Sequence, residues 1–240
     1  EMCIRDRLSH VQKIRYSFEN GREDSAVSKP MPKAVLKTEF RDTARASRAA
    51  QYGQWSPDER VFINASLTQH CCSLVQQTHA QRICAYIPVG NEPGNRAWLD
   101  TLAAHCTALF LPRSEDHGRL TWGLFTEWGE LEEGRFHIPQ PRTCIPHLLT
   151  TPPGVALILL PAISVGRDGS RMGKGAGYYD RALADIHTAV AAGNLAAAPV
   201  LAAIVYSSEL VDIVPTESHD VRMDWVVTPT ELHNCAQPSA

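Results

Sequence analysis

The sequence predicts an α/β protein with a largely parallel central sheet. Short apolar segments suited to buried strands alternate with longer segments of helical character along the 240 residues. Several of the apolar segments lead directly into turns rich in glycine and proline, which is where parallel sheets gather their ligands. Because 44% of the residues are hydrophobic, the chain can bury one good core, and we expect a single domain.

The first expected element is a basic helix from Lys37 to Gln51. Arg41, Arg45 and Arg48 recur at intervals of four and three residues, which places three cations on one helical face. A solvated basic face is the ordinary explanation of such a pattern. The arginines therefore indicate a ligand only if another part of the chain supports that interpretation.

A second helix is expected to begin after Ser56. The sequence Ser-Pro-Asp-Glu at 56–59 supplies an N-cap, a proline at the first helical position and a capping-box glutamate, and the helix should run into the low 70s. A strand at Arg82–Ile87 then leads through a turn-rich segment to a helix at Ala97–Cys106. The remaining expected strands are short and apolar: Ala108–Leu111, Val155–Leu160, Val200–Val205 and Trp225–Val227.

Residues 171–181, Arg-Met-Gly-Lys-Gly-Ala-Gly-Tyr-Tyr-Asp-Arg, are the most informative segment. Glycines let the backbone approach a ligand closely, and the arginines and lysine bring positive charge to the same place. An apolar strand precedes the segment and a helix is expected from Tyr178, so N–H groups and the helix dipole would face an anion. Neither the Walker pattern nor the G-x-G-x-x-G fingerprint fits the glycine spacing. We expect a polyphosphate here; the alternative is a solvated glycine turn.

Three polar segments follow expected strands and are predicted to meet in one cleft. They are Glu92, the stretch 166–177 and Thr228. The carboxyl ends of parallel strands lie at the same edge of a sheet, which is why these segments should converge. Residues 113–150 have less regular patterning and are expected to cover this cleft.

Composition and charge exclude several classes of protein. The formal net charge of −3 gives no broad basic surface, so neither nucleic-acid nor membrane binding is expected. Seven cysteines without C-x-x-C spacing argue against a disulfide framework and a structural zinc site. No apolar run reaches the length of a membrane span, and residues 1–30 lack a secretory signal. We expect a cytoplasmic protein with a flexible extension at residues 1–35, one domain at residues 36–232 and a tail at residues 233–240.

Taken together, these segments resemble the 5-formyltetrahydrofolate cyclo-ligase family, also called methenyltetrahydrofolate synthetases. The resemblance runs from about Glu39 to Thr228, and its most specific part is the glycine loop at 171–181. Four further segments support it in the same order: the basic helix, Tyr86-x-Pro-x-x-x-Glu92, Phe136-x-Ile-Pro-Gln-Pro141, and His219-Asp220 before Asp224.

The resemblance implies a three-layer, Rossmann-like α/β fold and an enzyme that uses ATP and Mg²⁺. Its substrate would be 5-formyltetrahydrofolate, with or without a polyglutamate chain, and its product 5,10-methenyltetrahydrofolate with ADP and phosphate. The formyl oxygen would attack the γ-phosphorus, and N10 would then attack the activated carbon. Such phosphoryl transfer depends on positioning and charge neutralisation, so no nucleophilic side chain is required. A monomer or weak homo-oligomer is expected.

The resemblance also implies roles for individual residues. ATP would be held by Arg41, Arg45, Arg171, Met172, Gly173, Lys174, Gly175, Ala176, Gly177, Tyr178 and Tyr179. Arg171, Lys174 and Tyr179 would be catalytic, and the folate would contact Glu92, Phe136, Tyr178 and Tyr179. Asp180 and Asp220 match the magnesium positions, and two carboxylates with phosphate oxygens suit this hard cation. The alternatives are a helix-dipole role for Asp180, a solvated Glu92 and core packing of Phe136.

Three departures from the family pattern leave other functions open. Gly166 stands where an aspartate is usual, with Asp168 two residues further on; the loop Glu92-Pro-Gly-Asn95 lacks a threonine that is often found there; and Arg41 stands where lysine is common. A non-catalytic relative that binds nucleotide or folate is one alternative. Another is a sugar-phosphate isomerase of similar architecture, which would need a catalytic carboxylate and lysine but would not bind nucleotide.

Overall fold

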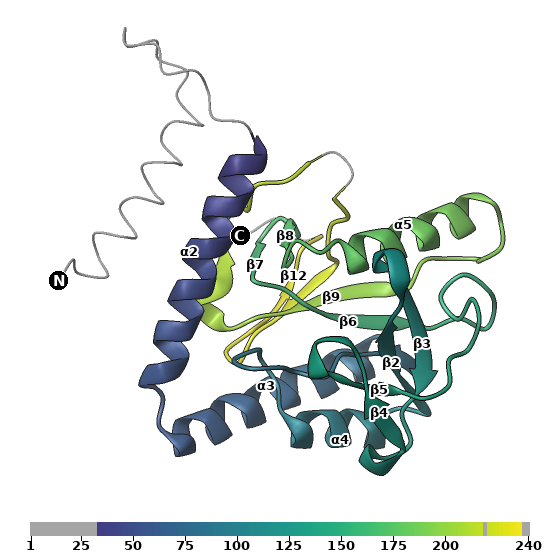
Figure 1. Cartoon of the computed structure of the whole chain (residues 1–240), viewed down its shortest axis with the longest axis horizontal. Coiled ribbons are helices and arrows are strands. Elements are labelled where there is room, and N and C mark those ends of the chain that lie inside the picture. Colours follow the sequence, from purple (N-terminus) through teal and green to yellow (C-terminus); the bar gives the residue numbers. More distant parts are fainter. Residues whose placement is uncertain (1–32, 218–219, 237–240) are drawn as a thin grey trace, which may run out of the picture. The chain divides into compact units, whose positions relative to one another are not determined.

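A seven-stranded sheet forms the centre of the computed structural model, which describes residues 33–217 and 220–236 (Figure 1). Across the sheet the strand order is β12-β11-β9-β6-β1-β2-β3. The strands are β1 (Arg82–Cys84), β2 (Ala108–Ser114), β3 (Leu120–Leu124), β6 (Leu157–Pro161), β9 (Val200–Ile204), β11 (Trp225–Val227) and β12 (Leu232–Asn234). The inner strands run parallel and both edge strands, β12 and β3, are antiparallel to their neighbours. The predicted α/β fold with a mostly parallel sheet is confirmed.

Helices cover both faces of the central sheet (Figure 1). Side chains alternate along each strand, so Ile83 packs with α3 (Pro57–Gln77) and α4 (Arg96–Ala104), whereas Cys84 packs with α5 (Tyr178–Ala191). Each face thus has its own buried core. Burial on both faces explains why the strands read as continuous apolar runs. The predicted three-layer arrangement is confirmed.

The order of the parallel strands marks where a ligand would bind. Counted along the chain, the parallel strands β1, β2, β6, β9 and β11 lie in the order 2-1-3-4-5. This is a doubly wound order, and its connections reverse direction between β1 and β6. The segments that leave the carboxyl ends of β1 and β6 therefore border the expected ligand crevice.

Within residues 33–81, two long helices precede the sheet. Helix α2 (Lys33–Gln54) begins before the predicted Lys37, and α3 begins at the predicted capping box. The backbone N–H of Glu59 donates to Ser56 Oγ at 3.2 Å, and the N–H of Ser56 donates to Glu59 Oε2 at 2.7 Å. These reciprocal bonds satisfy two N–H groups that the first helical turn leaves unpaired.

A small sheet that was not predicted from the sequence separates β6 from the glycine loop. It contains β7 (Ser164–Gly166), β8 (Arg171–Met172) and β10 (Leu210–Val211) in the order β10-β7-β8. The expectation that residues 166–177 form a loop directly after the strand at 155–160 is therefore wrong. Because β8 pairs antiparallel with β7, Arg171 belongs to a strand and is buried.

Residues 113–150 contain more regular structure than expected. Besides β3, this stretch includes an antiparallel ribbon of β4 (Leu131–Glu133) and β5 (Pro139–Pro141). Short 3₁₀ helices in the described chain are η1 (Asp116–Gly118), η2 (Trp128–Glu130), η3 (Arg135–His137) and η4 (Ser207–Glu209).

The expected chain boundaries are partly covered by the described residues. Most of the predicted extension at residues 1–35 lies outside them, as do residues 218–219 and the last four residues. Strand β12 includes residues 233 and 234 and pairs with β11, so the predicted tail begins too early. No helix in the described ranges is both long enough and apolar enough to span a membrane. The cysteines in these ranges are free thiols.

Candidate active site

The part of the glycine loop outside regular structure, residues 173–177, joins β8 to the start of α5 and is called the glycine loop from here on. Gly175 has a φ of +95° and Gly177, the N-cap of α5, has a φ of +72°. Residues with a Cβ rarely adopt these angles, which accounts for glycine at both positions. Lys174, Gly175 and Ala176 are exposed, so the backbone before the helix is accessible. A helix N-terminus reached by such a loop can bind an anion.

Two arginines of α2 contact the glycine loop. Arg41 Nε donates to the carbonyl of Gly173 at 3.1 Å, and Arg45 donates to the carbonyl of Lys174 at 2.7 Å. The basic helix and the glycine loop, far apart in sequence, therefore lie together as the nucleotide prediction requires. Each guanidinium has five N–H groups, so it can hold the loop and still donate to a phosphate.

Arg48, on the same helical face, is buried. Its guanidinium donates to the carbonyl of Ala162 at 2.6 Å and to Glu209 Oε2 at 2.7 Å. The exposed fraction of each side chain in this ion pair is below one tenth, at 5% for Arg48 and 7% for Glu209. Arg48 therefore shares the face of Arg41 and Arg45, as predicted, but its buried contacts attach α2 to η4 and to the segment between β6 and β7.

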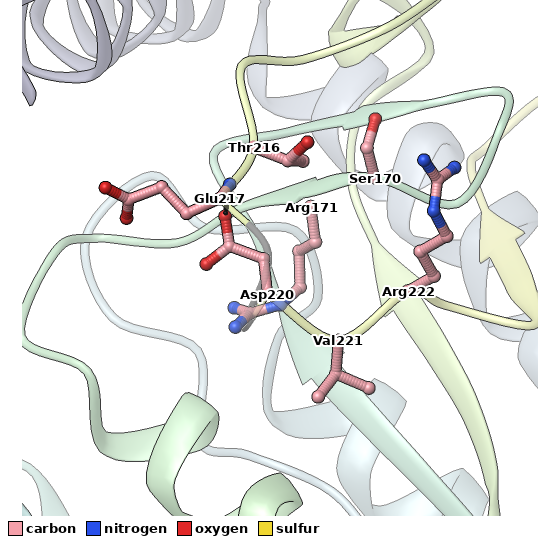
Figure 2. Close-up of a pocket in the computed structure, with 7 residues that line it drawn as sticks. All are labelled: Ser170, Arg171, Thr216, Glu217, Asp220, Val221 and Arg222. Carbon is pink, nitrogen blue, oxygen red and sulfur yellow. Dashed lines mark hydrogen bonds between the residues drawn. The ribbon is translucent and has the colours of Figure 1, made fainter. Parts of the chain in front are cut away.

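Arg171 and Asp180 form an ion pair at the start of α5. Arg171 is buried in β8, and Asp180 lies in the first turn of the helix. Arg171 also lines a pocket of about 290 Å³ with Asp220, as Figure 2 shows. The lining residues are Ser170, Arg171, Thr216, Glu217, Asp220, Val221 and Arg222.

Lys37 is a site residue that sequence reasoning missed. Its Nζ donates to Asp220 Oδ2 at 2.7 Å and to Glu217 Oε2 at 2.8 Å. Burial lowers the pKa of Lys37, but the hydrogen bonds that the lysine donates to Asp220 and Glu217 outweigh this and the pKa is raised, so the lysine stays charged. Lys37 precedes Arg41 by four residues, one helical turn, and that spacing was the available signal.

Glu92 and Lys174 meet beside the point where the strand order reverses. The Nζ of Lys174 lies 2.7 Å from Glu92 Oε1, and the N–H of Val89 donates to Glu92 Oε2 at 2.9 Å. Only 5% of the Glu92 side chain is exposed. The alternative of a solvated loop glutamate is therefore wrong. Thr228, also predicted to join this cleft, is buried and forms the turn before β12, where its hydroxyl accepts from the N–H of Glu231.

The predicted aromatic residues differ in their surroundings. Tyr179 packs edge-on against Trp122, with ring centroids 6.4 Å apart. Burial raises the pKa of Tyr179, so its hydroxyl stays neutral and can donate a hydrogen bond rather than act as a phenolate. Tyr178 is partly buried beside Arg181. Phe136 is 73% exposed in η3, so the alternative of core packing is wrong.

A chain of contacts links the turn that carries Phe136 to the glycine loop. Arg135, its neighbour, pairs with Asp116 of η1. Arg181 of α5 donates to the carbonyl of Gly118, also in η1, at 2.9 Å. The same guanidinium donates to the carbonyl of Ala176 at 2.7 Å.

A model of the 5-formyltetrahydrofolate cyclo-ligase family matches residues 35–229. The chain belongs to this family. A 5-formyltetrahydrofolate cyclo-ligase of Mycolicibacterium smegmatis is 40% identical over 153 residues, which cover 61% of this chain and 73% of the relative. One from Mus musculus is 25% identical over 212 residues, covering 85% and 96% of the two chains.

Solved structures of the same fold include two methenyltetrahydrofolate synthetases. The one from Aquifex aeolicus has a TM-score of 0.67 at 21% identity and covers 85% of this chain and 95% of its own. The one from Mycoplasma pneumoniae has a TM-score of 0.54 at 18% identity, with coverage of 82% and 98%. These likenesses support the fold assignment.

Two departures from the family pattern have structural explanations. A Cβ at Gly166 would lie 2.4 Å from Asp168 Oδ1 and 2.3 Å from Ser170 Oγ, so the carboxylate of Asp168 occupies the space that a side chain at 166 would need. In the Glu92 loop, Asn95 Oδ1 accepts from the N–H of Trp98 at 2.8 Å and caps α4. Asparagine is a strong N-cap, so that helix start is retained.

Asp168 should make the stability of the protein depend on acidic pH. Its burial raises the pKa, but hydrogen bonds from Ser170 and the ion pair with Arg222 outweigh this, and the pKa is lowered. A lowered carboxyl pKa stabilises the fold above the unfolded value near 4, and that contribution is lost as pH falls through the folded value. We expect Asp168→Asn to lower the free energy of unfolding by about 1 kcal/mol at pH 7. In urea titrations the difference should shrink below about pH 4; a difference independent of pH would contradict this.

The predicted magnesium residues flank the same buried arginine. Asp180 pairs with Arg171, and Asp220 shares the pocket with it. Within the described residues there is no group of three or more His, Cys, Asp or Glu side chains placed to hold a metal ion. Magnesium commonly uses one or two carboxylates and takes its other ligands from phosphate and water. The oxygen donors here therefore fit magnesium bound together with a nucleotide.

Proposed function

We propose that the protein catalyses the ATP- and Mg²⁺-dependent cyclisation of 5-formyltetrahydrofolate to 5,10-methenyltetrahydrofolate, releasing ADP and phosphate. One observation carries this proposal: Arg41 and Arg45 of α2 reach the glycine loop, whose Lys174 contacts the buried Glu92. The cations and the exposed backbone amides of the loop suit a polyphosphate. A pterin requires a buried carboxylate that accepts its N–H groups.

The glycine loop and its cations position the nucleotide. Exposed N–H groups before α5 and the guanidinium groups of Arg41 and Arg45 hold the phosphates, and Arg171 and Lys174 stabilise the charge that develops during transfer. The formyl oxygen attacks the γ-phosphorus, and ADP leaves. N10 then attacks the formyl carbon and closes the ring, and loss of the N10 proton and of phosphate gives the methenyl product. Positioning and charge neutralisation lower the barrier, with no covalent bond to the protein.

Magnesium, when bound, would neutralise phosphate charge and be held by Asp180 and Asp220. Glu92 orients the pterin by accepting N–H groups, with the exposed ring of Phe136 available to flank the folate. Tyr179 stays protonated and donates a hydrogen bond. The reaction thus uses side chains that bind, orient and neutralise.

The proposed reaction can be followed by its product. The methenyl compound absorbs in the near ultraviolet, where 5-formyltetrahydrofolate does not. Purified protein should raise this absorbance only when ATP, Mg²⁺ and the folate are all present. Binding of ATP or folate without any rise would refute the cyclisation and favour the non-catalytic relative, whereas absence of nucleotide binding would favour another α/β enzyme.

Asp220→Asn should weaken the dependence of turnover on magnesium. The amide keeps the size of the side chain but removes the negative charge that would attract the cation. We expect the Mg²⁺ concentration for half-maximal rate to rise about tenfold, with kcat partly restored at high Mg²⁺. The rate should be titrated against Mg²⁺ at saturating ATP and folate. An unchanged half-maximal concentration would remove Asp220 from the metal site.

The matched control for Asp220→Asn is Glu217→Gln. Glu217 accepts from the same lysine, Lys37, and lines the same pocket, but it is not a predicted magnesium ligand. Its substitution tests whether weakening the contact with Lys37 is enough to alter the magnesium requirement. Equal shifts in both variants would attribute the effect to Lys37 instead of the metal.

A further inference from the structure

One ion pair joins the two loops that border the proposed substrate crevice. Glu92 comes from the segment after β1, and Lys174 comes from the glycine loop before α5. The glutamate is 5% exposed and the lysine 51% exposed. The carboxylate is thus fixed in the interior, while the lysine reaches it from the surface.

This ion pair uses two groups that the proposed function assigns to different substrates. Glu92 would accept N–H groups of the pterin, and Lys174 would contact the phosphates of ATP. Oε2 of Glu92 is engaged by the N–H of Val89, and Oε1 by Lys174. A pterin that binds both carboxylate oxygens would therefore compete with the lysine for Oε1, and a lysine that turns toward a phosphate would give up its contact with Glu92.

The exchange can occur by rotation of one side chain. Arg41 holds the carbonyl of Gly173 and Arg45 holds the carbonyl of Lys174, so the backbone on this side of the loop is anchored to α2. The half-exposed lysine has a flexible four-carbon stem. Its ammonium group can move between the carboxylate and a phosphate while the loop stays in place.

The cost of the exchange depends on whether folate is present. If Lys174 leaves while the folate site is empty, a buried carboxylate loses its cation and faces the incoming negative phosphates, which is strongly unfavourable. If pterin N–H groups take the place of the lysine, the carboxylate keeps its partners. We propose that Glu92 is a positioning residue for Lys174, holding it away from the nucleotide until folate binds and releases it to the phosphates.

The proposal has a reciprocal consequence. Folate would increase the affinity for ATP because it frees Lys174, and by thermodynamic linkage ATP would increase the affinity for folate by the same factor. Couplings of this kind are typically about 5- to 150-fold. The enzyme would then favour ATP binding where a formyl group is present to accept the phosphoryl group.

The deciding experiment is calorimetric titration of the full-length protein with ATP and Mg²⁺ in the absence of folate. Glu92→Gln removes the charge that holds Lys174, so the variant should bind ATP about tenfold more tightly than the wild type. The inference rests on the proposed function, but the experiment distinguishes failure of the inference from failure of that function. Equal or weaker ATP binding by the variant overturns the inference alone, whereas absence of ATP binding by the wild type overturns both.

A second pair of variants excludes a simple effect of charge at a distance. Loss of the Glu92 charge would also reduce direct repulsion of ATP, without any role for Lys174. In a Lys174→Ala background, Glu92→Gln should therefore change ATP affinity by less than about twofold, because the lysine it would release is absent. The same tenfold gain in that background would overturn the inference.

Discussion

Replacing Arg171 with alanine is expected to lower kcat/KM for the cyclisation on the order of a thousandfold. The guanidinium pairs with Asp180 and lines the pocket shared with Asp220. Within the described part of the chain, its buried Nε has no hydrogen-bond partner. Buried donors are normally satisfied, so a bound phosphate is a natural acceptor at this position. Alanine would remove that donor and leave Asp180 without its cation.

The loss should appear in kcat as well as in KM for ATP, because charge builds up on the phosphoryl oxygens during transfer. Rates should be measured from the methenyl absorbance over a matrix of ATP and folate concentrations. Arg171→Lys keeps the charge but loses the forked geometry, so we expect it to recover part of the rate.

Arg119→Ala is the matched surface control for this loss. Arg119 lies outside the pocket, and 72% of its side chain is exposed. We expect its removal to change kcat/KM by less than about threefold. Thermal unfolding of each variant separates a catalytic loss from a folding defect. Activity of a folded Arg171→Ala protein within tenfold of the wild type would contradict the proposed role.

Local signals in the sequence predicted the elements that carry the site. The capping box at Ser56 and Glu59 placed the start of α3, and the helical sequence that follows the last loop glycine placed the start of α5 at Tyr178. Each of these two signals depends on residues within a few positions of one another. Each also requires a specific backbone conformation at those residues. The apolar strands were found for the same reason, although β1 ends at Cys84, three residues before the predicted Ile87.

Pairing between distant segments could not be predicted from those signals. Strands β7 and β8 are too short to show a periodic pattern in the sequence. Strand β7 also pairs with β10, which lies about forty residues later in the chain. The contact between the buried Glu92 and Lys174 likewise joins two loops that are far apart in the sequence. The spacing of Arg41, Arg45 and Arg48 predicts that they share one helical face. It does not predict their partners, which lie elsewhere in the chain.

Arg48 shows most clearly that a local pattern does not reveal a distant partner. Of the substitutions considered, its replacement should lower the stability of the fold the most. Its partner Glu209 lies 161 residues further along the chain, and both side chains are buried. Removing one member of a buried ion pair leaves the other charge without a partner, which typically costs about 3–5 kcal/mol. We expect Arg48→Met to lower the free energy of unfolding by about that amount in urea titrations monitored by circular dichroism.

Two further variants test the physical reason for this loss. Arg45→Met removes an arginine from the same helix whose side chain is half exposed, so it should cost less than about 1 kcal/mol. Arg48→Met combined with Glu209→Gln leaves no buried charge at this position, while the amide oxygen can still accept from the N–H of Tyr206. The double variant should recover about half of the lost stability.

The same contacts give Arg48 a defined link to the site. Its guanidinium holds the carbonyls of Ala162 and Ile163, and the N–H of Ile163 donates to the carbonyl of Met172, immediately before the glycine loop. Arg48 therefore fixes the distance between that loop and the helix that carries Arg41. If Arg48→Met folds, its KM for ATP should rise several-fold more than its KM for folate. A loss below 1 kcal/mol for Arg48→Met, or no recovery in the double variant, would show that the buried ion pair is not what attaches α2.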